Sequence, residues 1–330
     1  MLYVVSIFPI ILYLLLVKAL DGFSLTGWRP TLLCLGWGVV SCALGYLVTG
    51  VCDQDLGVFL PLFEEFIKFA PLLVLIVMRK AAFFAEVLIY GAAIASGFAI
   101  PENMLYVASA PEFGIGDALV RGFGTALMHM GCTALCANLA LMMMRLMEKW
   151  PTAARAAVSL LCLLPSSLIH YLYNLSLLAP MLQMVLVIVV MLPLFMLIYE
   201  IDGRLIHRWL DMCISNDVAL FSAIRKGELK TTTAGEYLLK AKEKFAPEVF
   251  FDICVYLGLY LEVSIDAKSH MIMRDAGMDI PLTEEQKLRN REKIRELGNL
   301  RKSIGRAGLL FLSPIVDMKT TDSWAIDELI

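Results

Sequence analysis

Charged residues are scarce in the first 200 positions of this 330-residue chain. Those positions hold 9 Lys and Arg and 11 Asp and Glu, which leaves 28 − 9 = 19 basic and 31 − 11 = 20 acidic residues for positions 201–330. The whole chain is 59% hydrophobic with a net charge of −3, whereas soluble domains contain about 45–50% apolar residues. The composition excludes a soluble cytosolic protein and gives no support for nucleic-acid binding. It predicts a membrane portion over residues 1–200 and a water-facing domain over residues 201–330.

Paired cysteines and the zinc motif HExxH are also missing. The eight cysteines are scattered without CxxC spacing, so we interpret them as small core residues and not as metal ligands or disulfide partners. No basic residue precedes the first apolar stretch, which therefore lacks the positive segment of a secretory signal peptide. We expect this stretch to be a retained membrane span.

Long apolar runs recur along the membrane portion. A helix needs about 20 apolar residues to cross a bilayer, and such segments lie at 1–18, 30–51, 58–78, 82–109, 117–145, 154–179 and 181–200. Basic residues gather in every second connection between them, and such connections are typically cytoplasmic. We predict an all-α polytopic bundle of about seven spans in the cell membrane. Its N-terminus is expected outside, and the mainly helical C-terminal domain is expected in the cytoplasm.

The C-terminal domain carries one clear helix-start signal. Thr283 and Gln286 have the spacing of a capping box, in which each side chain bonds a free backbone N–H of the other residue. The following stretch, 287–302, is rich in Arg, Lys and Glu. It predicts a solvated amphipathic helix, with docking to a membrane surface or to a partner protein as the alternative.

Four polar clusters interrupt the apolar spans. Ionisable groups near the bilayer centre cost at least a few kcal/mol each by insertion scales, so they are kept mainly where they pair or do chemistry. The clusters are Glu64, Glu65 and Lys68 in the third span, Glu102 and Asn103 in the fourth, His129 in the fifth, and His170 and Asn174 in the sixth. At about 1.5 Å per residue, all four fall at a similar depth in the external half of the bilayer. We therefore expect one site inside the bundle.

Helix geometry suggests how the charges of the third span are arranged. Glu64 and Lys68 are four residues apart and share a face, while Glu65 points about 100° away. We predict a Glu64–Lys68 ion pair that leaves Glu65 free. A free carboxylate of this kind can act as a general base.

Two asparagines are candidates for contact with a substrate. His170 and Asn174 share a helix face, so Asn174 can orient the imidazole or bond a substrate carbonyl. Asn103, next to Glu102, can serve as a donor to an oxyanion.

The order and spacing of these residues resemble the PrsW family of intramembrane proteases, within the wider group of CAAX prenyl proteases and bacteriocin-processing or immunity-type membrane proteases. The resemblance rests on Glu64-Glu65-x-x-Lys68, Gly97-Phe98-x-x-x-Glu102-Asn103, and the histidines His129 and His170. The EExxK pattern differs from the EExxxR of the CAAX enzymes, which disfavours prenyl-protein processing.

The resemblance implies a peptidase that cleaves a membrane-anchored protein on the external side, with an anti-sigma factor as a candidate substrate. It implies that Glu64 and Glu65 are the paired glutamates, Glu102 the third acid and His170 the essential histidine.

The residues admit more than one chemistry. Our main hypothesis needs no cofactor: Glu65 or Glu64 activates water, while His170, His129 and Asn103 or Asn174 stabilise the oxyanion and protonate the leaving amine. In the metal alternative, Glu102, His129 and His170 form a His2Glu zinc site. The rival functions are a proton- or ion-coupled transporter that uses the buried Glu, His and Lys cluster, and a non-catalytic membrane scaffold.

Overall fold

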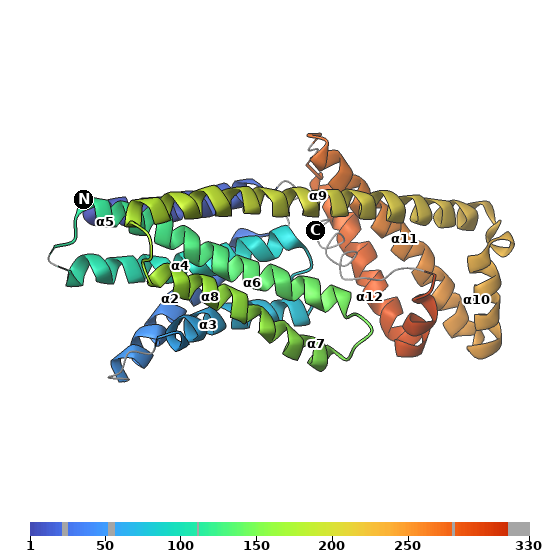
Figure 1. Ribbon diagram of the computed structural model, residues 1–330. Coiled ribbons are helices and arrows are strands. Elements are labelled where there is room, and N and C mark those ends of the chain that lie inside the picture. The colour runs from blue at the N-terminus through green and yellow to red at the C-terminus, as the bar shows by residue number, and fades with distance from the viewer. Residues whose placement is uncertain (22–25, 52–56, 111, 279–280, 316–330) are drawn as a thin grey trace. The chain divides into compact units, whose positions relative to one another are not determined.

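All regular structure in the described part of the chain is helical, as predicted. The computed structural model describes residues 1–21, 26–51, 57–110, 112–278 and 281–315. The elements are α1 (Leu2–Ala19), α2 (Trp28–Val51), α3 (Phe59–Val77), α4 (Phe84–Ser109), α5 (Ile115–Leu119), η1 (Val120–Thr125), α6 (Ala126–Leu146), α7 (Thr152–Ser159), η2 (Leu160–Cys162), α8 (Leu163–Asn174), α9 (Pro180–Lys226), η3 (Leu229–Thr231), α10 (Thr233–Lys244), α11 (Pro247–Asp275) and α12 (Glu284–Leu312) (Figure 1). The chain forms two compact units, Met1–Gly203 and Arg204–Ile330.

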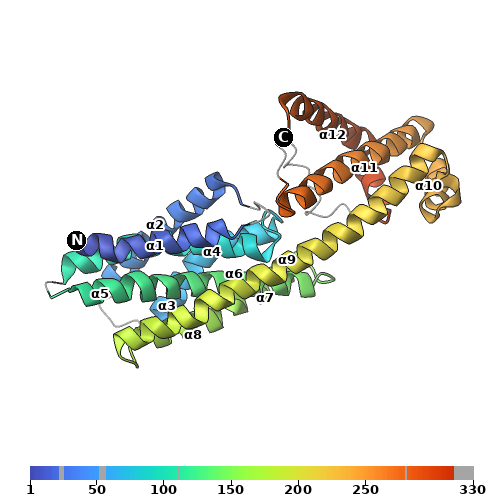
Figure 2. The ribbon, with the colours of Figure 1, turned by 90° about the horizontal axis from the view of Figure 1, so that it is seen from above.

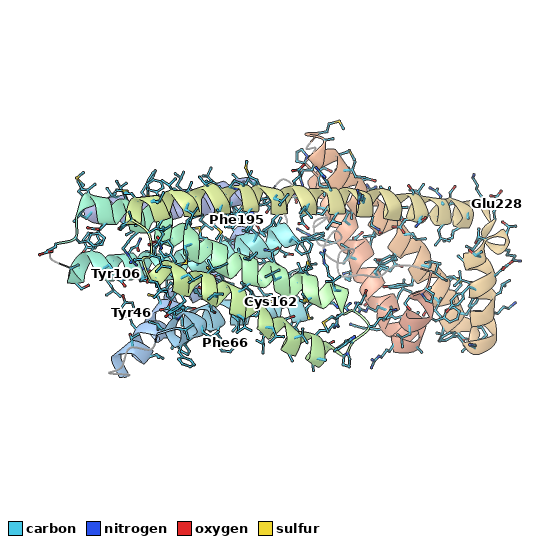
Figure 3. All side chains as sticks on the ribbon, viewed as in Figure 1. Tyr46, Phe66, Tyr106, Cys162, Phe195 and Glu228 are labelled. Atoms are coloured by element: carbon cyan, nitrogen blue, oxygen red, sulfur yellow. The ribbon has the colours of Figure 1, made fainter. Side chains whose placement is uncertain are left out.

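The first unit contains the apolar helices. Six helical segments of the described residues are long and apolar enough to cross a membrane: Leu2–Ala19, Trp28–Gly50, Phe84–Ser109, Ile115–Leu146, Thr152–Asn174 and Pro180–Ile206. The remaining predicted span corresponds to α3, a 19-residue helix that carries Glu64, Glu65 and Lys68. Apolar side chains such as Phe66 and Tyr46 are exposed on the bundle (Figure 3). A multi-pass helical membrane protein is the architecture that these features support.

Helix α4 is the centre of this bundle. It packs against α1, α2, α3 and α6, and most of its length is buried (Figure 2). Its closest neighbour is α2: a Cβ atom added to Gly97 would lie 1.9 Å from the Leu35 carbonyl oxygen, and one added to Gly38 would lie 2.0 Å from that of Ile94. The two backbones therefore touch, and glycine is required on both sides of the crossing.

The first turn of α4 is also fixed from outside the helix. The backbone N–H groups of Phe84 and Ala85 donate to the Asp202 carboxylate on α9, over 3.1 and 2.9 Å. These N–H groups have no partner within their own helix, so Asp202 acts as a cap supplied by a distant segment. The contact ties α9 to α4.

The segment before His129 departs from regular α-helix. Residues Val120–Thr125 (η1) form a π-helical turn between α5 and α6. A Cβ atom on Gly122 would lie 2.9 Å from the Val5 carbonyl oxygen of α1, so this turn packs closely on α1. The wider turn changes the direction in which Arg121 projects relative to α6.

The second unit contains packed amphipathic helices. The predicted capping box is confirmed at the start of α12, where Gln286 N–H donates to Thr283 Oγ1 over 3.3 Å and Thr283 N–H donates to Gln286 Oε1 over 2.9 Å. Helix α12 packs against α11, in which Lys268 is buried and pairs with Asp217 at 2.7 Å.

The cysteines do not form disulfides where they are described. Six of them are free thiols, and five of these are buried. Cys52 and the Cys213 side chain lie outside the described residues.

Candidate active site in the helix bundle

Most of the predicted polar residues meet in one cluster. Glu64, Glu65 and Lys68 on α3, Glu102 on α4, His129 on α6 and His170 on α8 each contact at least one other member. The two imidazole rings lie edge to face with their centroids 4.7 Å apart. Side chains from four helices therefore meet in one cluster, as the sequence predicted from the depths of the spans.

Glu65 is at the buried end of this cluster. Its Oε1 atom lies 2.5 Å from Lys68 Nζ and 2.9 Å from His170 Nδ1. Its Oε2 atom accepts hydrogen bonds from Thr133, at 3.1 Å, and from Ser166, at 3.5 Å. Both carboxylate oxygens are thus bonded within the protein, and the residue has no solvent exposure. An ionised carboxylate only accepts hydrogen bonds, so Nδ1–H of His170 is the donor.

The predicted Glu64–Lys68 ion pair is wrong. Lys68 pairs with Glu65, three residues away, and both side chains are fully buried. Side chains at i and i+3 meet on a helix as readily as those at i and i+4, and the donors from α6 and α8 favour Glu65. Glu64 is instead the free carboxylate. Its side chain is 13% exposed, and its Oε2 atom lies 3.7 Å from His170 Nε2.

His129 lies between a cation and an acid. Its Nδ1 is 3.3 Å from Lys68 Nζ, and its Nε2 is 3.2 Å from Glu102 Oε2. An ammonium only donates, so Nδ1 is the acceptor and Nε2–H donates to Glu102. Phe98 packs against both groups: its ring centroid is 5.1 Å from that of His129 and 4.4 Å from Lys68 Nζ. The Gly97-Phe98 dipeptide of the sequence motif therefore supplies a helix contact and an aromatic support.

Arg121 belongs to the site, although sequence analysis did not select it. Its guanidinium lies 2.8 Å from Glu102 Oε2, and its Nε–H donates to Asn103 Oδ1 over 3.0 Å. It also stacks 3.5 Å above the Tyr106 ring. The signal that could have found it is an intramembrane arginine two helical turns before His129.

Asn103 does not face a substrate. Its amide nitrogen donates to the Ser6 carbonyl oxygen of α1 over 3.0 Å, while its amide oxygen accepts from Arg121. The residue is fully buried. Both ends of the amide are used within the protein, so the predicted role as an oxyanion donor is not supported. Its contacts suit a structural support for Arg121.

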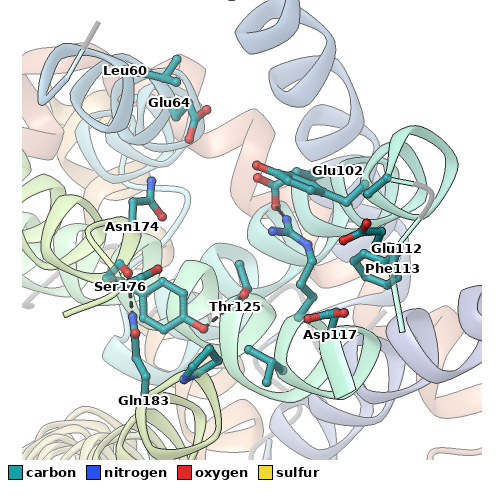
Figure 4. Close-up of a pocket in the computed structure, with 16 residues that line it drawn as sticks. Leu60, Glu64, Glu102, Glu112, Phe113, Asp117, Thr125, Asn174, Ser176 and Gln183 are labelled. Carbon is teal, nitrogen blue, oxygen red and sulfur yellow. Dashed lines mark hydrogen bonds and ion pairs between the residues drawn. The ribbon is translucent and has the colours of Figure 1, made fainter. Parts of the chain in front are cut away.

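A cavity of about 710 Å³ opens onto the cluster. Its lining includes Glu64, Glu102, Arg121, Thr125 and Asn174. Figure 4 shows Glu64 and Asn174 on one side and Glu102 across from them. Asn174 therefore lies where a substrate can contact it, whereas the buried Glu65 does not line the cavity. This arrangement exposes one carboxylate of the glutamate pair and conceals the other.

The residues also contain a possible metal-ligand set, which differs from the predicted one. Ligand atoms of Glu65, His129 and His170 lie within 4.8 Å of one another, so Glu65 takes the place that we expected for Glu102. Two histidines and a glutamate are typical of catalytic zinc sites. Lys68 Nζ, however, contacts two of the three groups, at 2.5 Å from Glu65 and 3.3 Å from His129. In this arrangement the Lys68 ammonium already holds one atom of Glu65 and one of His129, so these two atoms do not face a metal ion.

Comparison with known proteins identifies the family of the chain. No curated protein and no solved structure matches the chain. Residues 27–198 match the family described as PrsW family intramembrane metalloprotease, and this range includes every residue of the cluster. The match covers more than half of the chain and confirms the resemblance seen in the sequence motifs. The chain is thus an integral multi-pass membrane protein and belongs to the PrsW family of intramembrane proteases.

Proposed function

We propose that this protein is an intramembrane endopeptidase in which Glu64 and His170 together activate the water that attacks a peptide bond. The observation that carries the proposal is the different placement of the two neighbouring glutamates. Glu64 lines the cavity and lies 3.7 Å from His170 Nε2, whereas Glu65 is buried on the opposite side of the same imidazole.

The distance between Glu64 and His170 suits a bridging water. Glu64 Oε2 and the unprotonated His170 Nε2 are both acceptors, so one water can donate a hydrogen bond to each. Glu64 takes a proton as the water oxygen attacks the carbonyl carbon. It then gives this proton to the amine nitrogen as the C–N bond breaks, which yields a carboxylic acid and an amine. Such general acid–base catalysis contributes about 10²- to 10⁴-fold.

Glu65 orients His170 for this step. By accepting the Nδ1–H, it keeps the lone pair on Nε2, the nitrogen that faces Glu64. Buried carboxylates commonly fix the tautomer and orientation of a working imidazole in this way. Lys68 balances the charge of Glu65, and Thr133 and Ser166 bond its second oxygen.

Asn174 is the best-placed donor for the oxyanion. It lies one helical turn after His170 and lines the same cavity as Glu64. Its amide N–H can bond the negative oxygen that forms when water attacks. Loss of one such donor typically lowers kcat by about 10²- to 10³-fold.

The sequence supports a class of substrate and a side of the membrane for cleavage. The family resemblance supports a membrane-anchored protein as substrate, with an anti-sigma factor as one candidate. The positions of the basic connections support an external N-terminus, a site in the external half of the bilayer, and a cytoplasmic domain over residues 201–330.

Reconstitution into liposomes tests the proposal against the transporter and scaffold alternatives. Wild-type protein is expected to cleave a co-reconstituted single-span substrate, while Glu64→Gln and His170→Ala insert normally and do not cleave it. Glu112→Gln is the matched control, because Glu112 is an exposed carboxylate of the same cavity outside the cluster. Undiminished cleavage by both site variants would exclude this site. Proton or ion flux that depends on Glu64, without cleavage, would favour a transporter.

A further inference from the structure

We propose that Arg121 is a positioning residue that holds Glu102 against His129. This inference rests on the proposed function for its effect on cleavage. Its structural part, the orientation of His129, can be tested separately.

One oxygen of Glu102 serves two partners. Its Oε2 atom lies 2.8 Å from the Arg121 guanidinium and 3.2 Å from His129 Nε2. The carboxylate lines the cavity and is 15% exposed. Without the arginine, a carboxylate next to water is free to change rotamer, and the His129 N–H then loses its acceptor. Arg121 therefore fixes an interaction in which it takes no direct part.

Two further contacts hold the guanidinium itself. Its Nε–H donates to Asn103 Oδ1 over 3.0 Å, and its plane stacks 3.5 Å from the Tyr106 ring centre. Asn103 is anchored in turn by its bond to the Ser6 carbonyl oxygen. The planar guanidinium of arginine can contact Glu102 and Asn103 with its N–H groups while its face stacks on Tyr106. The ammonium of a lysine could make only part of these contacts.

The backbone around Arg121 also helps to hold its side chain in place. The π-helical turn Val120–Thr125 contains Arg121, and short π-helical turns inside α-helices are frequent at functional sites. The turn packs on α1, because a Cβ atom on Gly122 would lie 3.0 Å from the Ser6 carbonyl oxygen. The same carbonyl accepts from Asn103. One peptide group of α1 thus supports both the turn that carries Arg121 and the amide that holds it.

The contacts continue from Arg121 to the imidazole of His170. In order, the chain of contacts is Arg121, Glu102, His129, Lys68, Glu65 and His170, with successive distances of 2.8, 3.2, 3.3, 2.5 and 2.9 Å. A change at Arg121 is therefore expected to reach His170 through the hydrogen bonds of His129.

Kinetics of Arg121 variants test the role in catalysis. Arg121→Gln is expected to lower kcat about 10- to 100-fold, as is typical when a residue that orients a working group is lost, with KM changed less than kcat. Arg121→Lys is expected to recover only part of the loss. In a Glu102→Asp background, whose shorter side chain already breaks the contact, Arg121→Gln should cause little further loss. Losses that multiply in the double variant would show that Arg121 acts independently of Glu102 and would overturn the inference.

Nitrogen NMR of ¹⁵N-histidine-labelled protein tests the structural part. The chain has only four histidines, and the signals absent from His129→Gln identify those of His129. Arg121→Gln is expected to shift the Nε2 signal of His129, whereas Arg155→Gln is not. Arg155 is the matched control: it is a buried arginine of the same bundle that bonds Met144 and Thr152. An unchanged His129 spectrum in folded Arg121→Gln and Arg121→Lys proteins would overturn the inference. Absence of cleavage by the wild type would refute the proposed function and leave this NMR test valid.

Discussion

Glu64 and Glu65 are adjacent in sequence, yet glutamine at each position is expected to damage a different property. Glu64→Gln removes the proton acceptor from the cavity. The expected loss in kcat is about 10²- to 10⁴-fold, or about 2.7–5.4 kcal/mol of transition-state stabilisation at 1.36 kcal/mol per factor of ten. The free energy of unfolding should change by less than about 1 kcal/mol, because the Glu64 side chain is partly exposed and forms no buried ion pair with Lys68.

Glu65→Gln leaves the Lys68 ammonium buried without its carboxylate. Removing one partner of a buried ion pair typically costs about 3–5 kcal/mol, a large part of the about 5–15 kcal/mol that stabilises a folded domain. Both side chains of this pair are fully buried, which places the expected cost within that range. The double variant Glu65→Gln with Lys68→Met removes both charges and should recover part of the lost stability, although it should not recover activity.

Two measurements on the same preparations separate these effects. Thermal unfolding in detergent gives stability, and the rate of substrate cleavage in liposomes gives activity. We expect Glu64→Gln to unfold like the wild type and to be inactive, and Glu65→Gln to unfold at a clearly lower temperature. If Glu65→Gln is as stable as the wild type, or if Glu64→Gln still cleaves, the assignment of the two glutamates is wrong.

Three further predictions concern the metal question and two helix contacts. Chelator treatment of the purified wild type should leave the cleavage rate unchanged, because Lys68 already neutralises the possible ligand set; stoichiometric zinc that is lost together with activity would contradict this. Gly97→Ala should force α2 and α4 apart, since the new Cβ would lie 1.9 Å from the Leu35 carbonyl oxygen. Thermal unfolding should show that the free energy of unfolding falls by about 1–3 kcal/mol. Asp202→Ala should cost about 0.5–2 kcal/mol through the lost cap of α4; Asp202→Asn, which keeps an acceptor, should cost less, and equal losses in the same assay would argue against the cap.

The bundle and the meeting of its Glu, Lys and His side chains in one cluster could be predicted from the sequence. Apolar runs of bilayer length predict spans because unpaired backbone groups are not tolerated in lipid. The few ionisable residues within those runs, such as His129 and Glu102, are then expected to find one another. Successive spans run in opposite directions, and counting residues from the external end of each span places these residues at a similar depth. The contacts between α3, α4, α6 and α8 confirm that they meet.

The partners within the site could not be predicted. On one helix, Lys68 reaches both Glu64 and Glu65, and helix geometry does not choose between them. The choice depends on Thr133 and Ser166, which bond Glu65 from positions 68 and 101 residues away in sequence. Hydrogen-bond donors so far away in sequence produce no periodic pattern in the sequence around Glu65.

The supporting residues were misjudged for the same reason. Asn103 is adjacent to Glu102 in sequence, which suggested a shared substrate role. Its amide instead bonds the Ser6 carbonyl oxygen, 97 residues earlier, and the Arg121 side chain. Arg121 was not selected from the sequence, because the π-helical turn and its packing on α1, which bring it to the cluster, leave no motif in the sequence.

The contact between α2 and α4 also limits how a substrate can arrive. At Gly38 and Gly97 the two backbones touch, so neither a lipid chain nor an extended peptide, which needs about 4.8 Å beside a neighbouring strand, can pass between these helices. A transmembrane segment therefore cannot enter the bundle laterally between α2 and α4 at this crossing. The cavity that Glu64 lines, with Leu60 of α3 and Pro180 of α9 among its other lining residues, is where a peptide can reach this carboxylate. Selection among membrane proteins is therefore expected to depend on the residues that line this cavity, before the scissile bond reaches the water.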